Sequence, residues 1–384
     1  MIAGRAKDIP PFIVMDILEK AQEMERAGVD IVHLEIGEPD FDTPECIKAA
    51  GRKAITDGRT HYTHSLGIIE LREAVAAHYH RRYGAEVSPD NILICSGTSP
   101  AMFMIFTALL EAGDEVILSD PHYACYPNFV RFLNGRPVFV NVDEDDGFQY
   151  RPEEIKARLT NRTRAVFINS PANPTGTLLS PDRMSRIADI SPLVISDEIY
   201  HGLVYGGERE HSILEFTDRA VVINGFSKLY AMTGWRLGYI IAPAEFIRPM
   251  QKIQQNFFIS AGSVPQWAGV AALNQAGPDV KRMVAVYDKR RIFLIQGLRD
   301  LGFKILTEPK GAFYILVNAA HLSRDSYRLA FDILDKAHVG VTPGIDFGTN
   351  AEGYLRFSYA TSVENIAEGL GRLKGYLDGR QDRS

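Results

Sequence analysis

Short apolar runs recur through the middle of the chain. Seven of them are rich in β-branched residues and barely alternate with polar ones: 92–94, 115–118, 137–140, 165–168, 193–195, 220–223 and 237–241. Such runs are typical of strands covered on both faces, and the spacing between them leaves room for crossover helices. Helical patterns at 102–111 and 183–190 fit that role. The pattern predicts an α/β fold with a mostly parallel seven-stranded sheet.

The last hundred residues have a different texture. They contain a long amphipathic helix, two strand-like runs and two further helices, at 279–301, 313–317, 354–358, 326–336 and up to residue 377. This mixture predicts a second, smaller α+β domain, and we expect the helical pattern at 13–27 to pack with it. The predicted division is therefore a large domain at 45–280 and a discontinuous small domain at 1–44 and 281–384. Residues 378–384 are expected to be frayed.

Composition narrows the class of protein. Hydrophobic residues make up 46% and charged residues 23%, as in soluble globular proteins. The formal charge of -6 argues against a nucleic-acid partner. The first residues lack the apolar core of a signal peptide, and no apolar run is long enough for a membrane span. The three cysteines lie far apart, so we expect a protein of a reducing compartment, the cytoplasm, that binds neither membrane nor nucleic acid.

Several common motifs are missing from the sequence. No Gly-x-Gly-x-x-Gly follows a strand, and neither a phosphate-binding Gly-x-x-x-x-Gly-Lys-Ser/Thr nor a His-Glu-x-x-His occurs. The ten histidines show no metal-ligand spacing, and His61, His64 and His122 lie in turn-rich segments where surface histidines are common. We therefore expect no metal site. The paired arginines, including Arg290 and Arg291, are expected on solvated helix faces.

Four segments lie at the carboxyl ends of predicted strands, where open α/β sheets bind their ligands. The first, 96–100, joins a strand to a helix, and Thr98 is expected to cap that helix. Free amides and hydroxyls at a helix N-terminus bind phosphate. Taken alone, this segment is better explained as an ordinary capped turn.

Two further segments offer polar groups for a ring-shaped ligand. Asn173 is held between prolines and a glycine, in a pose suited to donating to a ring oxygen. Asp197 follows a buried strand, where a carboxylate needs a partner. A protonated ring nitrogen would be such a partner, and helix N-capping is the alternative.

The fourth segment, 224–236, is the most specific. Lys228 lies among apolar residues after a strand, where desolvation favours the neutral amine. A neutral amine can form an imine with an aldehyde cofactor. Arg236 can present a planar fork to a phosphate. A lysine with a buried stem and an exposed charge is the alternative, but it leaves Ser227 and Arg236 without a role.

Together these segments resemble the class I/II aminotransferases of the fold-type I pyridoxal-phosphate superfamily, especially the bacterial aspartate-aminotransferase-like subgroup. The resemblance runs from Ile-Gly-Glu-Pro-Asp-Phe at 36–41 to Arg-Phe-Ser-Tyr-Ala at 356–360. It implies pyridoxal 5'-phosphate (PLP) as the cofactor, bound by the large domain. It also implies a homodimer with shared active sites.

The resemblance assigns a role to each candidate residue. Lys228 would form the Schiff base and shuttle a proton, Asp197 would hold the ring nitrogen protonated, and Tyr200 with Asn173 would bond the phenolic oxygen. The remaining cofactor contacts would be ring stacking by Tyr123, and phosphate binding by Thr98, Ser99, Ser227, Arg236 and, from the neighbouring subunit, Tyr62. Arg356 would bind the substrate α-carboxylate, helped by the backbone of Gly37 and by Asn173.

The sequence departs from members that select acidic substrates. These tend to carry Ser and Thr after the early proline and a Lys in the phosphate loop, where this chain has Phe12, Val14 and Ser99. An apolar wall without a fixed cation favours alanine, branched or aromatic side chains over aspartate. The expected activity is ping-pong transamination between an amino acid and a 2-oxo acid, with glutamate and 2-oxoglutarate as one pair.

Two alternatives accompany this expectation. A PLP-dependent C–S β-lyase acting on sulfur amino acids would use the same fold, lysine and aspartate. A non-catalytic regulator built on an aminotransferase-like domain would carry an added basic domain. The short stretch before Gly37 and the presence of Lys228, Asp197 and Arg356 together argue against the regulator.

Overall fold

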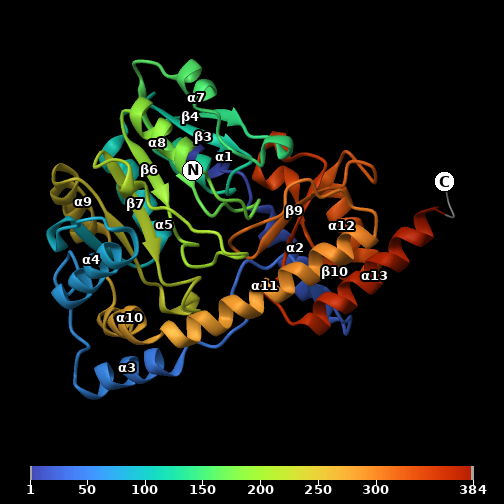
Figure 1. The fold of residues 1–384 in the computed structure, drawn as a ribbon, viewed down its shortest axis with the longest axis horizontal. Coiled ribbons are helices and arrows are strands. Elements are labelled where there is room, and N and C mark those ends of the chain that lie inside the picture. Colours follow the sequence, from blue (N-terminus) through green and yellow to red (C-terminus); the bar gives the residue numbers. More distant parts are fainter. Residues whose placement is uncertain (1, 382–384) are drawn as a thin grey trace.

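A seven-stranded sheet forms the centre of the larger of two lobes (Figure 1) in a computed structural model that describes residues 2–381. Its order is β2-β8-β7-β6-β5-β3-β4. The strands are β2 (Ile92–Cys95), β3 (Glu115–Asp120), β4 (Arg136–Asn141), β5 (Thr163–Asn169), β6 (Val194–Asp197), β7 (Ala220–Gly225) and β8 (Gly238–Ile241). Every apolar run predicted as a strand is one. Only β8 runs antiparallel to its neighbours, so the predicted mostly parallel α/β fold is confirmed.

Helices cover both faces of this sheet because both faces are apolar. Along β7, Ala220 and Val222 join one buried core while Val221 and Ile223 join the other, as the two-residue period of a strand requires. The first face is covered by α3 (Glu45–Thr56), α4 (Ile69–Tyr83), α7 (Pro152–Arg158), α8 (Pro181–Ile190) and α10 (Ser263–Gln275). The second is covered by α5 (Thr98–Leu109), α6 (Tyr126–Phe132) and α9 (Ala244–Phe257).

The smaller lobe is built around two short sheets. An antiparallel sheet consists of β11 (Thr342–Pro343), β12 (Tyr354–Ser358) and β9 (Tyr314–Asn318), and β1 (Val32–His33) pairs in parallel with β10 (Val339–Gly340). The helices here are α2 (Ile13–Arg26), α12 (Ser326–Ala337) and α13 (Val363–Gln381), and α11 (Gly277–Asp300) extends between the lobes (Figure 1). Ile17 and Ala21 of α2 lie in the same core as β9 and β12. We retain 45–280 and 1–44 with 281–384 as the proposed division into domains.

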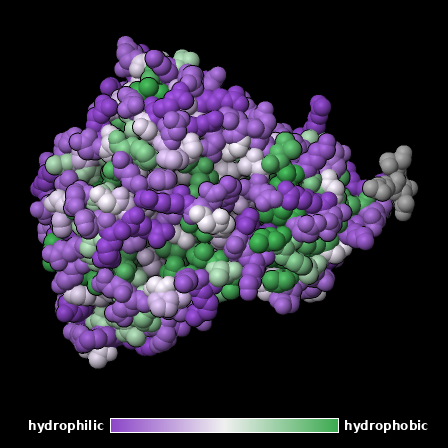
Figure 2. Space-filling model, in the orientation of Figure 1, coloured by the Kyte–Doolittle hydropathy of each residue, from purple (hydrophilic) through white to green (hydrophobic). Residues whose placement is uncertain are grey.

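The surface is mainly hydrophilic in the view of Figure 2, with apolar side chains gathered mostly over the smaller lobe. No helix within residues 2–381 combines the length and apolar character needed to cross a bilayer. A short helix, α1 (Gly4–Asp8), precedes α2 and buries no residue.

Several local expectations were wrong. Arg290 and Arg291 are buried because they pair with Asp40 and Asp288. His122 is buried as well, and the ring of Phe139 stacks on it. The closing helix continues to Gln381, so the expected fraying does not begin at residue 378. Residues 382–384 lie outside the described part.

Candidate active site

A cavity of about 400 Å³ opens where the carboxyl ends of the parallel strands face the smaller lobe. Every residue predicted for the site except Tyr62 lines it: Phe12, Val14, Gly37, Thr98, Ser99, Tyr123, Asn173, Asp197, Tyr200, Ser227, Lys228, Arg236 and Arg356. The structure therefore brings residues from both ends of the chain to one site.

The loop between β2 and α5 forms one end of the cavity. Gly97 occupies the N-cap position of α5 with φ +98, and a Cβ there would lie 2.6 Å from Nη2 of Arg236. Glycine is thus needed both for the backbone and for the close approach of the guanidinium. Thr98 is the first helical residue and does not cap the helix, which corrects the expectation from the sequence.

These groups form what we call the phosphate cup: Gly97, Thr98, Ser99, Ser227 and Arg236. Hydroxyls, a guanidinium and the amides at a helix N-terminus are the donors that bind a phosphate dianion. A hydrogen bond from Nη1 of Arg236 to the carbonyl oxygen of Thr233, at 3.0 Å, helps to orient the guanidinium.

Asp197, at the end of β6, is 4% exposed. Its Oδ2 accepts from the hydroxyl of Tyr126 at 2.7 Å and its Oδ1 from the amide of Ile199 at 3.1 Å. Burial raises the pKa of Asp197 to about 6, although both hydrogen bonds act in the opposite direction. No helix follows Asp197 directly, so the helix-capping alternative is wrong. A buried carboxylate that lines a cavity suits a cationic ring nitrogen.

Lys228 reaches the cavity from the loop after β7. Its Nζ donates to the carbonyl oxygen of Gly37 at 2.7 Å. Burial lowers the pKa of Lys228 to about 8, partly opposed by the charge of Glu38. A Cβ on Gly37 would lie 2.2 Å from the hydroxyl of Tyr314, so only glycine lets this backbone approach. The neutral amine, the form that acts as a nucleophile or base, is therefore far more abundant near neutral pH than in an ordinary lysine.

Arg356 of β12 provides the cation of the smaller lobe and is 3% exposed. Its Nη1 donates to Oδ1 of Asn173 at 2.9 Å, and its Nη2 donates to the carbonyl oxygen of Glu35 at 2.8 Å. The guanidinium also lies 4.3 Å from the ring centre of Tyr314 and 4.8 Å from that of Phe347. A planar cation fixed in this way can hold a carboxylate in one orientation.

Tyr200 and Tyr123 complete the aromatic part of the site. The hydroxyls of Tyr200 and Tyr314 lie 3.0 Å apart, and burial raises the pKa of Tyr200 well above its ordinary value. Tyr200 therefore stays protonated and can donate a hydrogen bond to a ligand oxygen. Tyr123 lies between this group and the N-terminal segment, with its ring edge-on to that of Phe12.

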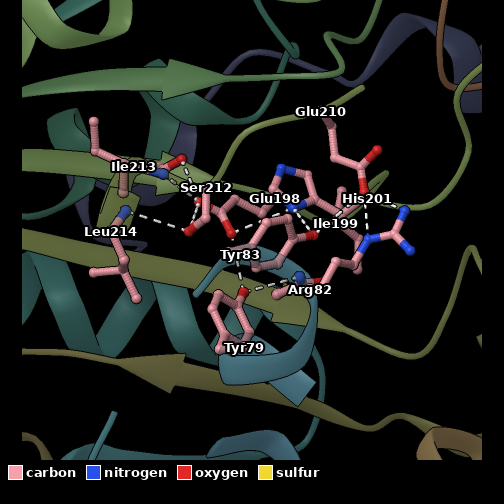
Figure 3. Close-up of polar contacts among 12 residues, drawn as sticks. Tyr79, Arg82, Tyr83, Glu198, Ile199, His201, Glu210, Ser212, Ile213 and Leu214 are labelled. Atoms are coloured by element: carbon pink, nitrogen blue, oxygen red, sulfur yellow. Dashed lines mark hydrogen bonds and ion pairs between the residues drawn. The ribbon is translucent and has the colours of Figure 1, made fainter. Parts of the chain in front are cut away.

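A second buried carboxylate, which does not line the cavity, belongs to the network of polar contacts drawn in Figure 3. Glu198 is fully buried and accepts hydrogen bonds from Ser212 Oγ at 2.9 Å, the amide of Ile213 at 3.1 Å and the hydroxyl of Tyr79 at 3.0 Å. Burial raises its pKa to about 8. Asn224, at the end of β7, donates to the same tyrosine at 3.2 Å. This network ties the strand end that carries Asp197 to the one that precedes Lys228.

Tyr62 lies elsewhere. It is 85% exposed and lines a separate open depression together with Arg59 and Trp267. Sequence reasoning also missed residues that the structure places in the site, notably Tyr126, Tyr314, Glu35 and Met15. Tyr126, the first residue of α6, follows Tyr123 by three positions, and the sequence offers no other local signal for it.

A phosphate cup, a buried carboxylate and a lysine amine in one cavity of this fold define a PLP enzyme of fold type I. The family model for aminotransferase class I and II matches residues 29–373. The (5-formylfuran-3-yl)methyl phosphate transaminase of Methanocaldococcus jannaschii is 41% identical, over 98% of this chain and 100% of its own. The aspartate/prephenate aminotransferase of Thermus thermophilus is 39% identical over 98% of each chain.

Solved structures agree with these matches. The aspartate aminotransferase from Thermus thermophilus with maleate superposes with a TM-score of 0.93 at 38% identity, over 97% of this chain and 99% of its own. A Methanococcus jannaschii protein, described as similar in its active site to kynurenine aminotransferases, gives 0.92 at 41% identity, over 98% and 100%. The chain belongs to the class I and II aminotransferases and is a PLP-dependent enzyme.

Proposed function

We propose that the enzyme transfers the amino group between an amino acid with an apolar side chain and a 2-oxo acid, with glutamate and 2-oxoglutarate as the second pair. The observation that carries the apolar preference is what we call the apolar wall: Phe12, Val14, Met15 and Leu18. All four line the cavity and lie on or next to the first turns of α2. The pairing with glutamate rests on the family resemblance.

The charges of the cavity support the same proposal. Among its described lining residues, the cations are Lys228, Arg236 and Arg356. In the proposed arrangement Arg236 holds the cofactor phosphate, Lys228 meets the cofactor aldehyde and Arg356 holds the substrate α-carboxylate. A second carboxylate, as in aspartate, then has no cation of its own within the subunit, whereas an apolar side chain gains by leaving water against the wall.

In the proposed reaction each of these residues has a separate role. When bound, PLP supplies an aldehyde for the substrate amine and a ring that accepts the electrons released at the substrate Cα. Asp197 keeps the ring nitrogen protonated, and Tyr200 with Asn173 donates to the ring oxygen. Lys228 Nζ, with its pKa lowered to about 8, would take the proton from the substrate Cα and deliver it to the carbon that was the cofactor's aldehyde carbon. Arg356 fixes the substrate orientation through the α-carboxylate.

We further propose a homodimer in which Tyr62 of each subunit contacts the phosphate in the other. The exposed position of Tyr62, outside its own cavity, supports this arrangement. A cytoplasmic location is proposed from the cysteine pattern of the sequence. The relatives named above are aminotransferases or transaminases, so the comparisons give no support to the β-lyase alternative.

The test is a half-reaction screen of the purified holoenzyme, in which each amino acid is added alone and the loss of the cofactor absorbance band is followed. We expect the fastest conversion with alanine, branched or aromatic amino acids, and regeneration by 2-oxoglutarate. The amine corresponding to (5-formylfuran-3-yl)methyl phosphate belongs in the panel because of the Methanocaldococcus relative. Fast conversion by aspartate and glutamate alone would refute the apolar preference, and release of ammonia and pyruvate from cystathionine would favour the lyase.

A further inference from the structure

The first turn of α2 has its cap supplied from the opposite end of the chain. The amide of Ile13 donates to Oδ1 of Asp346 at 3.0 Å, and the amide of Val14 lies 3.3 Å from Oδ2. The residue at the N-cap position, Phe12, provides no side-chain cap. Because the first amides of a helix have no acceptor within it, Asp346 takes over the role of the cap.

Asp346 lies on a segment that is fixed by both lobes. It belongs to a short 3-10 helix, Gly344–Phe347, and is 8% exposed. The amide of Ile345 donates to Ser326 Oγ at 3.1 Å, at the start of α12 in the smaller lobe. The amide of His122 donates to the carbonyl oxygen of Phe347 at 2.9 Å from the larger lobe. The carboxylate of Asp346 is thus a rigid reference point.

The chain that precedes the first turn of α2 has few other attachments. The preceding helix α1 buries no residue, and its contact with the larger lobe includes Arg5 over the ring of Phe132. Figure 1 shows α1 against the larger lobe and α2 within the smaller one. Where the chain passes from α1 to α2, the ring of Phe12 lies edge-on to the ring of Tyr123, with centroids 5.8 Å apart. The first turn of the apolar wall therefore depends on this contact and on Asp346, whereas the second turn of α2 is held by the fully buried Ile17.

Asp346 does not itself line the cavity, but the residue that follows it contacts Arg356, the proposed anchor of the substrate carboxylate. Phe347, the following residue, is fully buried and lies 4.8 Å from the guanidinium of Arg356. One short segment therefore supports both the carboxylate anchor and the apolar wall, which fixes the distance between the two ends of a substrate.

We propose that Asp346 is a positioning residue for substrate selection: it holds the first turn of α2 so that the apolar wall contacts the substrate side chain. This deepens the proposed function and rests on it, because the wall has to contact the substrate. The effect belongs to selectivity and not to the chemical step, since Asp346 does not touch the residues that handle the proton.

The decisive variant is Asp346→Ala, assayed as holoenzyme with the best branched or aromatic amino acid of the screen and with alanine, whose methyl group depends least on the wall. We expect the ratio of kcat/KM between the two substrates to fall roughly five- to thirtyfold, the range set by loss of a helix N-cap. KM should carry the change, while kcat at saturation stays within about twofold. Amide hydrogen exchange at Ile13 and Val14 should be faster.

Two variants separate this role from general destabilisation. Ser180→Ala removes the cap of α8 in the larger lobe, where Ser180 Oγ accepts from the amide of Arg183 at 3.3 Å, and should leave the ratio unchanged. Asp346→Asn keeps one acceptor oxygen and should give an intermediate ratio. Equal losses in the Asn and Ala variants, or an unchanged ratio in Asp346→Ala, would overturn the proposal.

The role of Asp346 can still be tested if the apolar preference is refuted or if the Asp346→Ala variant does not fold. If the wild-type enzyme prefers aspartate, the apolar preference is refuted, yet the ratio to alanine still reports whether Asp346 positions the wall. If Asp346→Ala does not fold, hydrogen exchange in Asp346→Asn decides. Unchanged exchange at Ile13 and Val14 in that folded variant contradicts the cap.

Discussion

The two sides of the cavity are built in different ways. The residues we call the cofactor floor, Asp197, Tyr200 and Lys228, extend from ends of neighbouring strands, and Asp197 and Tyr200 are each 4% exposed. The apolar wall lies on or next to the first two turns of α2, and its Met15 is 44% exposed. The floor is supported by the buried network of Glu198, whereas the cap of the wall comes from a single distant carboxylate. In the proposed function, the residues at the strand ends carry out the reaction. Substrate selectivity depends instead on the start of α2, which can change without disturbing the sheet.

The largest effect is expected from the floor. In Lys228→Ala, turnover should fall by roughly 10²- to 10⁴-fold with every amino acid, because the group proposed to move the Cα proton is lost. Single-turnover kinetics with the best substrate measures this loss. Thermal unfolding serves as the control for folding, and a wild-type rate in this variant would overturn the role of Lys228.

A smaller loss is expected at the anchor shared by both sides. Arg356→Lys keeps the charge but loses the planar fork, so kcat/KM should fall roughly 10- to 100-fold for amino acids. The matching amine without a carboxylate is the control, and its slow half-reaction should be unaffected. Equal losses with both compounds would mean that Arg356 does not bind the α-carboxylate.

The pH dependence of cofactor uptake tests the floor without a mutation. The pKa of Lys228 is lowered to about 8, so the neutral amine becomes more abundant as pH rises through 8 and then saturates. The rate at which cofactor-free protein incorporates PLP should therefore rise about tenfold from pH 7 and level off above about pH 9. Stopped-flow absorbance follows the uptake. A rate that keeps rising beyond pH 10 would indicate an ordinary lysine.

The smallest effect is expected from the wall itself. Phe12→Ala should raise KM for a branched or aromatic amino acid roughly fivefold, because one apolar contact of the side chain is lost. The value for alanine should change less. Phe257→Ala, at an exposed phenylalanine of α9 outside the cavity, is the matched control. A uniform change for all substrates would contradict the division between floor and wall.

The strands were predictable because each contains an apolar run, and most of these runs are buried. The predicted strands also locate their carboxyl ends. The sequence alone therefore places four residues at the same edge of the sheet: Thr98, Asn173, Asp197 and Lys228. The roles of Arg356 and Tyr123 came only from the family resemblance, since nothing local marks them as ligands.

What could not be predicted are contacts between residues far apart in sequence. Tyr126 meets Asp197 across 71 positions, Tyr200 meets Tyr314 across 114, and Ile13 meets Asp346 across 333. A side chain's neighbours also decide its burial. Arg290 resembles a solvated residue by type, but its pairing with Asp40 makes burial affordable.

The reversed direction of β8 has a consequence for how the enzyme folds. A parallel strand would end at the edge of the sheet where the cavity lies, whereas β8 begins there, which places Arg236 opposite the loop that follows β2. Because β2 joins the sheet through β8, the phosphate cup exists only after this edge of the sheet has closed. The cofactor therefore binds the completed sheet in preference to its precursors, and its presence in the cell would shift the folding equilibrium towards the finished enzyme.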